Sequence, residues 1–243
     1  MRYFIAAAQF ITILPLGKAE TFDPPKMIPY FPVVGILLGI LVALFDHVAS
    51  SLWSIPVASM LDVIFLAILT GAFHIDGLGD SADGLLGKRS KEKTLAIMKD
   101  SRLGTMGLVA ILCGLSMKWA GISDLDAGRS LLLVIVPAYA RGSMLFGIRF
   151  FDYGRSGGGT GLDFFKEELK LSAFWGLIIP VVLSGWLGWQ AIWLNLIFAV
   201  VTAVIIWYYH RRLGSITGDM LGAMTEILES AMFLLVSIGS VTW

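Results

Sequence analysis

Four side chains that could take part in catalysis stand close together in the segment GAFHIDGLGDSADGLLG, residues 71–87. They are His74, Asp76, Asp80 and Asp83. On a helix, residues four and seven positions apart share a face, so the three aspartates are predicted to form one acidic stripe. Carboxylates this close repel one another unless a cation lies between them, and the segment follows an apolar stretch where unpaired charge is costly.

The acidic stripe predicts a magnesium site. Mg²⁺ prefers carboxylate oxygens completed by water and substrate phosphates, and two such ions can stabilise both sides of a phosphoryl group. We therefore predict that Asp76, Asp80 and Asp83 hold one or two Mg²⁺ ions during phosphoryl transfer. The alternative is that they only cap helices or form a solvated face. His74 is expected to contact substrate, carry a proton or donate a hydrogen bond.

Glycines alternate with these acids at positions 77, 79, 84 and 87. Because glycine has no side chain, we expect them to leave room for a bulky phosphorylated substrate. A second glycine-rich stretch, GRSGGGTG at residues 154–161, fits either a flexible turn or a loop whose backbone N–H groups approach phosphates.

Basic residues suited to phosphate follow in AIMKDSRLGTMG, residues 96–107. This segment supplies Lys99, Asp100 and Arg102. Arginine grips phosphate oxygens with two hydrogen bonds, while lysine supplies a point charge. We predict that these three residues bind substrate, although part of the positive charge also fits the general bias of cytoplasmic loops.

Further charged residues fall within apolar stretches downstream. Arg141 and Glu226 are predicted to bind substrate, because charges at membrane depth are costly and are usually paired or functional. The segment GSITGDMLGAMTE, residues 214–226, also contains Thr217 as a predicted substrate contact. Asp219 is predicted to be catalytic or to cap the helix that begins there.

The composition identifies an all-α, polytopic membrane protein. Of 243 residues, 57% are hydrophobic and only 15% are charged, and the mean hydropathy is +0.81. A spanning helix needs about 20 apolar residues, and about seven such stretches occur. They cover residues 31–50, 55–73, 106–122, 130–148, 171–188, 191–209 and 219–238. Residues 1–16 are expected to form an interfacial helix that is retained, and the whole chain is expected to be one catalytic domain, 1–243.

The basic residues predict the orientation. Those in the loops after the second and fourth spans and before the last span lie on one side by parity, and the opposite side has mainly Arg129. The positive-inside rule places the long loops, and with them the acidic stripe, in the cytoplasm. The one cysteine, Cys113, excludes an intramolecular disulfide or a cysteine-based metal site, and we expect it to be buried.

Four segments together carry a resemblance: residues 71–87, 97–107 and 214–229, and the opening AAAQFITILPL at 6–16. They resemble the cobalamin synthase family, the adenosylcobinamide-GDP ribazoletransferases. The resemblance implies a multi-pass enzyme of a prokaryotic inner membrane that joins adenosylcobinamide-GDP to α-ribazole or its 5′-phosphate. GMP is released, and Mg²⁺ is required. No nucleic-acid partner is expected, and a homo-oligomer is compatible with the resemblance. One departure occurs at Ile13, where relatives often have arginine.

The resemblance also assigns residues. His74 and the acidic stripe fall on the family's acidic motif, Asp100 and Arg102 on its K-D-S-R-x-G motif, and Asp219 on its T-G-D motif. Glu226 stands where the last span of the family tends to carry an acid. The resemblance implies that a ribose hydroxyl attacks the phosphorus that bears cobinamide, with Asp83 or Asp219 accepting its proton.

Two other functions compete. A CDP-alcohol phosphatidyltransferase carries a similar aspartate motif, but with an Ala-Arg pair where this chain has Asp80 and Ser81. A cation-coupled transporter would suit the intramembrane charges, yet the acids here gather at one side rather than at the midplane of two related halves.

Overall fold

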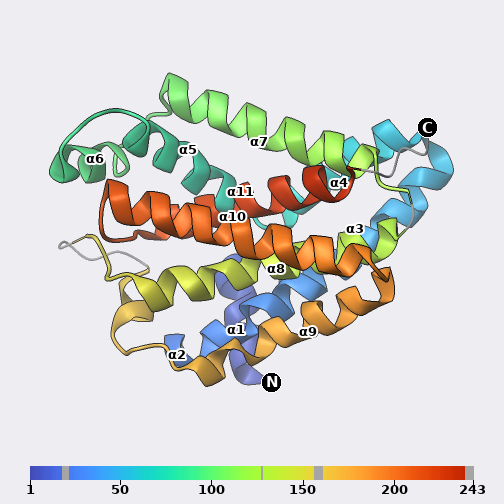
Figure 1. Ribbon diagram of the computed structural model, residues 1–243, viewed down its shortest axis with the longest axis horizontal. Helices are drawn as coiled ribbons and strands as arrows, with labels where there is room; N and C mark the ends of the chain where they lie inside the picture. Colours follow the sequence, from blue (N-terminus) through green and yellow to red (C-terminus); the bar gives the residue numbers. More distant parts are fainter. Residues whose placement is uncertain (18–21, 127, 156–160, 239–243) are drawn as a thin grey trace.

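The computed structural model describes residues 1–17, 22–126, 128–155 and 161–238 and is built from helices (Figure 1). Within these residues no β-strand occurs, and one isolated bridge joins Tyr153 to Ile216. The all-α prediction is confirmed. In chain order the α-helices are α1 (Arg2–Ile11), α2 (Pro24–Met27), α3 (Phe31–Leu52), α4 (Ile55–Leu69), α5 (Phe73–Leu85), α6 (Lys91–Ile97), α7 (Thr105–Ser123), α8 (Arg129–Phe150), α9 (Trp175–Ser184), α10 (Gln190–Arg212) and α11 (Gly218–Val236).

A helix occupies each of the seven predicted spans, but fewer are long and apolar enough to cross a membrane alone. In the described part of the chain these are Pro24–Leu52, α7, α8 and α10. The bent pair α4 and α5 makes a fifth if it counts as one span, and the apolar segment Leu171–Leu187 is shorter. The polytopic membrane bundle is thus confirmed, while the count of seven exceeds what length and composition support.

The second predicted span, residues 55–73, does not continue as one straight helix. Helix α4 ends at Leu69, and α5 starts at Phe73 after a bend of 90°. Gly71 and Ala72 make the bend with positive φ angles of 60° and 57°. A non-glycine residue rarely adopts this conformation, so packing must hold the turn in place. The bend directs the acidic helix α5 away from the apolar helix before it.

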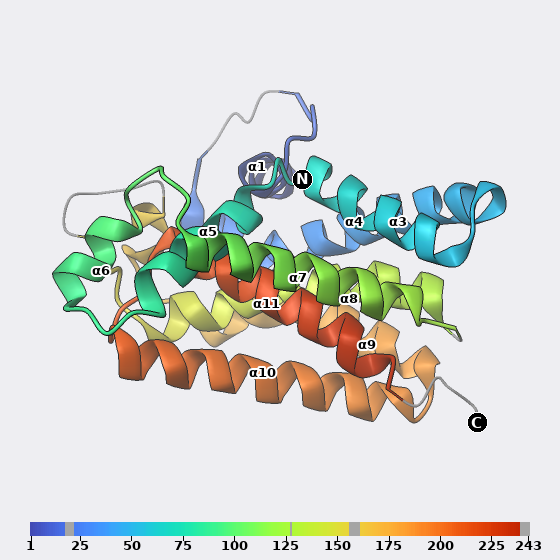
Figure 2. The ribbon, with the colours of Figure 1, turned by 90° about the horizontal axis from the view of Figure 1, so that it is seen from above.

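Helices α8 and α11 form the centre of the bundle. Helix α3 packs along α8, and α11 packs against α5, α7 and α8. The α3–α8 contact is close because Gly35 and Gly39 meet the backbone of α8 directly, the small-residue packing common in membranes. Figure 2 shows α11 between α7 and α10, whose outer surfaces are largely exposed.

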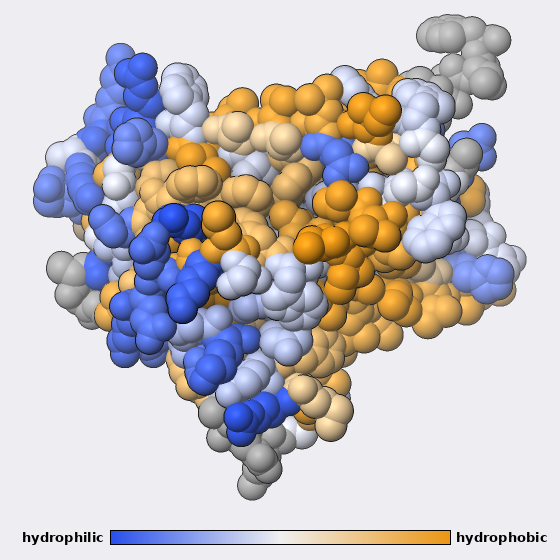
Figure 3. Space-filling view, turned by 60° about the horizontal axis from the view of Figure 1, so that its bottom comes forward, coloured by the Kyte–Doolittle hydropathy of each residue, from blue (hydrophilic) through white to orange (hydrophobic). Residues whose placement is uncertain are grey.

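The ends of the bundle differ in character. Helix α6, the end of α10 and the start of α11 gather at one end, where hydrophilic residues concentrate; apolar surface covers much of the remainder (Figure 3). The predicted N-terminal helix is present as α1, which packs against α3 through Ala6, Ala7 and Ala8, all buried. Its location at a membrane interface stays a prediction.

A buried ion cluster ties three helices together. Arg129 at the start of α8 donates hydrogen bonds to Asp46 of α3 (2.6 Å) and Asp62 of α4 (3.1 Å). It also donates to Ser59 Oγ at 3.0 Å. Because an unpaired charge inside an apolar bundle is strongly unfavourable, this cluster fixes the mutual positions of α3, α4 and α8.

Replacing Arg129 with methionine should lower the free energy of unfolding in detergent by about 3 kcal/mol, because it strands two buried carboxylates. The loss is measured by thermal unfolding in detergent, with the fraction of protein that stays monodisperse as the readout. The matched control is Arg149→Met in the same helix, which removes an exposed pair with Glu168 and should cost less than about 1 kcal/mol. Equal losses in the two variants would contradict the role given to the cluster.

Candidate active site

The crossing of α5 and α11 brings predicted site residues from distant parts of the chain together. A Cβ atom added to Gly77 would lie 2.7 Å from the backbone oxygen of Asp219, and one added to Gly222 would lie 3.3 Å from Cα of His74. The two helices are therefore in backbone contact, and Asp219 joins the acidic face of α5. The glycine at 77 serves helix packing here, which differs from the expected role of leaving room for substrate.

Arg155 is a site residue that the sequence interpretation missed. The loop before it pairs with the chain ahead of α11, because the Ile216 N–H donates to the Asp152 carbonyl at 3.0 Å. This pairing places the Arg155 guanidinium on the Asp219 carboxylate, and the same group donates to the Met98 carbonyl at 3.1 Å. The sequence feature that could have indicated Arg155 is its position as the single arginine in the glycine-rich stretch 154–161. Residues 156–160 of this stretch lie outside the described part of the chain.

Asp76 and Asp80 carry unpaired negative charge. Among the described residues neither carboxylate has a hydrogen-bond donor or an ion-pair partner. Burial, together with the nearby carboxylates of Asp76 and Asp219, raises the pKa of Asp80 to about 6. The cluster therefore has more negative charge than Arg155 alone balances, which is the electrostatic condition for binding a cation.

Asp83 has different surroundings. Its carboxylate accepts hydrogen bonds from the backbone N–H groups of Gly104 (2.7 Å) and Gly107 (2.9 Å), at the start of α7. The first turn of a helix presents unpaired N–H groups and the positive end of its dipole, so a carboxylate stabilises it well. Asp83 thus joins α5 to α7. Both of its carboxylate oxygens already accept hydrogen bonds from the protein. Its predicted metal and catalytic roles stay predictions.

Lys99, Asp100 and Arg102 lie at the surface, between α6 and α7. Arg102 Nε donates to both Asp100 oxygens, at 2.9 and 3.1 Å. The Arg102 side chain is 87% exposed, and it lowers the pKa of Asp100 to about 2. Lys99 is also exposed. This loop immediately precedes Gly104, so its cations stand on the segment that Asp83 anchors.

Arg141 and Glu226 lie in a second buried ion cluster. Lys118 Nζ is 2.7 Å from a Glu226 oxygen and 2.6 Å from a Glu229 oxygen, and Arg141 pairs with the other oxygen of Glu229. Two cations and two acids balance here. Arg141 and Glu226 are enclosed between α7, α8 and α11, so neither side chain is exposed at a surface where substrate could bind. Their substrate-binding roles remain predictions. Lys118 was missed, although a lysine within an apolar span signals such a partner.

His74 and Thr217 also occupy interior positions. His74 is fully buried at the α5–α11 contact, and neither ring nitrogen has a partner among the described residues. Thr217 is the N-cap of α11, since its hydroxyl accepts a hydrogen bond from the Met220 N–H at 3.3 Å. The cap of this helix is therefore Thr217 rather than Asp219, which leaves the Asp219 carboxylate for Arg155.

Comparison with known proteins shows the family of the chain. The family model described as cobalamin-5-phosphate synthase matches residues 3–237. The chain belongs to this family. A relative from Geotalea daltonii, named adenosylcobinamide-GDP ribazoletransferase, is 32% identical, with 98% of each chain covered. One of the same name from Thermoanaerobacter sp. (strain X514) is 33% identical over 98% of each chain. No solved structure matches.

The acidic residues of this family member offer ligands of the kind that magnesium prefers. In the described residues no group of three or more histidine, cysteine, aspartate or glutamate side chains is arranged to hold a metal ion. Mg²⁺, however, is usually held by one or two carboxylates, with waters and substrate phosphates completing its shell. Asp76 and Asp80 provide two such carboxylates without competing donors, so the residues fit an ion that arrives with a phosphorylated substrate.

Replacing Gly107 with alanine should reduce the activity of this family member at least tenfold. A tenfold loss corresponds to an increase of about 1.4 kcal/mol in the activation free energy. The added Cβ would collide with the Asp83 carboxylate and lie 2.8 Å from the Gly79 backbone oxygen, so α5 would shift from α7. Initial rates in detergent measure the effect. Gly185→Ala is the control, because a Cβ there meets nothing within 4 Å. Unchanged rates in Gly107→Ala would count against the Asp83 anchor.

Proposed function

We propose that this chain is the membrane transferase that joins adenosylcobinamide-GDP to α-ribazole, or to its 5′-phosphate, with release of GMP. The observation that carries the proposal is the match to the cobalamin-5-phosphate synthase family over residues 3–237. The geometry supports it, because the family's separate acidic motifs converge where Asp76, Asp80 and Asp219 meet Arg155. A cluster of acids with one arginine suits transfer of a phosphoryl group.

In the proposed reaction a ribose hydroxyl of ribazole attacks the phosphorus that bears cobinamide. A new phosphorus–oxygen bond forms, the bond to the bridging oxygen breaks, and that oxygen leaves with GMP. Mg²⁺, held by Asp76 and Asp80, would neutralise negative charge on the phosphate oxygens.

The chain's own residues supply the remaining parts of the mechanism. Arg155 turns from Asp219 to the pyrophosphate, where its planar group binds phosphate oxygens. This exchange releases the Asp219 carboxylate to accept the hydroxyl proton. Arg102, exposed on the loop before α7, would bind the GDP portion. Asp83 acts by holding α5 against α7, so that the acidic face keeps its position.

The proposal includes the location of the reaction. The basic residues of the loops predict a cytoplasmic active site in a prokaryotic inner membrane. In support, α6, the end of α10 and the start of α11 gather at the end of the bundle where hydrophilic residues concentrate (Figures 1 and 3). Adenosylcobinamide-GDP carries a charged diphosphate, which suits a site open to the cytoplasm.

The decisive experiment measures GMP release from adenosylcobinamide-GDP by the purified protein in detergent. Release should require both α-ribazole, or its 5′-phosphate, and Mg²⁺, and should stop when EDTA removes the metal. Release without any acceptor would indicate hydrolysis rather than transfer. No release with either acceptor, from monodisperse protein, would refute the proposed function. Activity that survives EDTA would refute only the magnesium requirement.

Replacing Asp80 with asparagine should lower turnover more than about a hundredfold, because the amide keeps the size of the side chain but loses the charge that binds the metal. Steady-state rates at several Mg²⁺ concentrations measure the effect. Asp163→Asn is the matched control, since Asp163 forms an exposed pair with Lys166. Activity in Asp80→Asn above about a tenth of the wild-type value would remove Asp80 from the metal site.

A further inference from the structure

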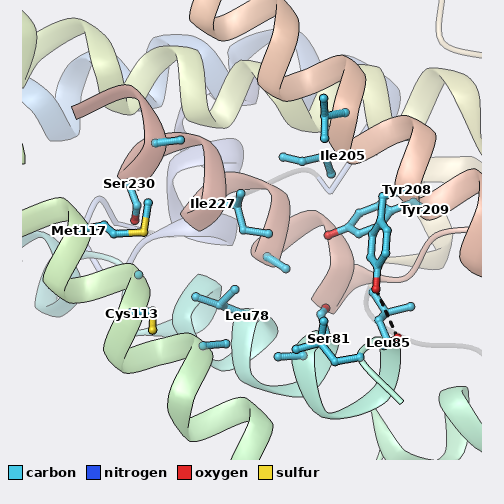
Figure 4. A pocket seen from close by; sticks show the side chains of 17 residues that line it. Leu78, Ser81, Leu85, Cys113, Met117, Ile205, Tyr208, Tyr209, Ile227 and Ser230 are labelled. Carbon is cyan, nitrogen blue, oxygen red and sulfur yellow. Dashed lines mark hydrogen bonds between the residues drawn. The ribbon is translucent and has the colours of Figure 1, made fainter. Parts of the chain in front are cut away.

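An apolar groove opens on the side of the bundle between α7 and α10. Its volume is about 370 Å³, and its floor is formed by α11, with α5 closing one end (Figure 4). Leu78, Ala110, Met117, Ile205 and Ile227 are among its lining residues. Cys113, expected to be buried, is exposed and also lines this groove.

The groove is separate from the acidic cluster. On α5 the residues that line it include Leu78, Ser81 and Leu85, whose helical positions lie opposite the acidic stripe. A phosphorylated substrate on the acidic face would therefore not reach the groove without passing α5. The groove needs an occupant of its own.

The exposed helix faces that flank the groove indicate which phase it opens to. On α7, Leu108, Val109 and Leu112 are exposed, and on α10 Val200 and Val204 are exposed. In a helix long enough to cross a membrane, such a face contacts hydrocarbon chains. A groove that opens between two such faces is open to the lipid phase, and an alkyl chain is the ligand whose chemistry matches its lining.

Polar atoms without partners stand at the α5 end of the groove. Arg212 Nε donates to the Leu85 carbonyl at 2.7 Å, as does the Tyr208 hydroxyl at 3.3 Å. The NH2 group of Arg212 is buried and has no partner among the described residues, and the same holds for the Ser81 hydroxyl. Figure 4 shows Ser81 beside Leu85 and Tyr208, with Ser230 and Met117 at the far end.

We propose that this groove binds one anionic glycerophospholipid. An acyl chain lies along α11 between α7 and α10, the ester region meets Ser81, and the phosphate approaches Arg212. The arrangement matches a phospholipid from end to end: cation, hydroxyl donor, then apolar channel. Exposed Arg211, next in sequence, adds attraction for an anionic headgroup. The Ser230 hydroxyl is given no role. The bound lipid supports α5 from behind its acidic face.

The test is native mass spectrometry of the full-length protein in detergent, titrated with palmitoyl-oleoyl phosphatidylglycerol or with the matching phosphatidylcholine. Wild type should bind one phosphatidylglycerol at least about tenfold more tightly than phosphatidylcholine. Ala110→Phe fills the groove and should weaken phosphatidylglycerol binding by at least about tenfold, because several buried CH₂ groups are lost. Arg212→Gln should reduce the preference for phosphatidylglycerol.

Val109→Phe, on the neighbouring face of α7 outside the groove, is the matched control and should bind as wild type does. Equal affinity for the two lipids in wild type, or unchanged binding in Ala110→Phe, would overturn the proposal. A second measurement needs no variant: phosphatidylglycerol should slow the reaction of Cys113, the single cysteine, with N-ethylmaleimide. Absence of protection would also overturn it. Neither readout depends on transferase activity.

Discussion

The contact between the Asp83 carboxylate and the first turn of α7 is the constraint on which the site depends. It connects the acidic helix, which the bend at Gly71 and Ala72 directs away from α4, to a long helix of the bundle. Without it, α5 would be held mainly by its glycine contact with α11. The two contacts together define one rigid surface, with Asp76 and Asp80 facing outward and Asp219 beside them. Asp83, predicted as one of three metal ligands, thus anchors α5 to the start of α7.

The sequence was sufficient for the helical membrane bundle, the acidic stripe and the family, because these depend on local composition, helical spacing and short motifs. It was insufficient where the answer depends on contacts between distant segments. The pairing of Arg155 with Asp219 arises from a loop bridging to Ile216, and the partners of Arg141 and Glu226 include Lys118, 23 positions from Arg141. The bend after Leu69 was missed because hydropathy continues through it, and only the backbone conformation of two residues reveals it.

Two groups of charges among the described residues differ in how they are balanced. Arg129 with its two aspartates, and Lys118 and Arg141 with their two glutamates, are enclosed and matched, so they determine how helices pack. Asp76 and Asp80 are unmatched and lie on a surface. Beside these two matched clusters, the unmatched acids of the described residues point to a ligand that supplies the positive charge. The NH2 group of Arg212, unpartnered in the described part of the chain and near the apolar groove between α7 and α10, likewise points to an anionic phospholipid.

The balanced cluster of Lys118, Arg141, Glu226 and Glu229 has a mechanical consequence. Moving α7, α8 or α11 along its axis by one turn would separate ions inside an apolar core, at a cost of several kcal/mol. These three helices therefore behave as a fixed frame through the catalytic cycle. The connection from Leu86 to Gly104, which carries α6 and Arg102, is one of the segments outside that frame, so its movement would leave the ion cluster intact.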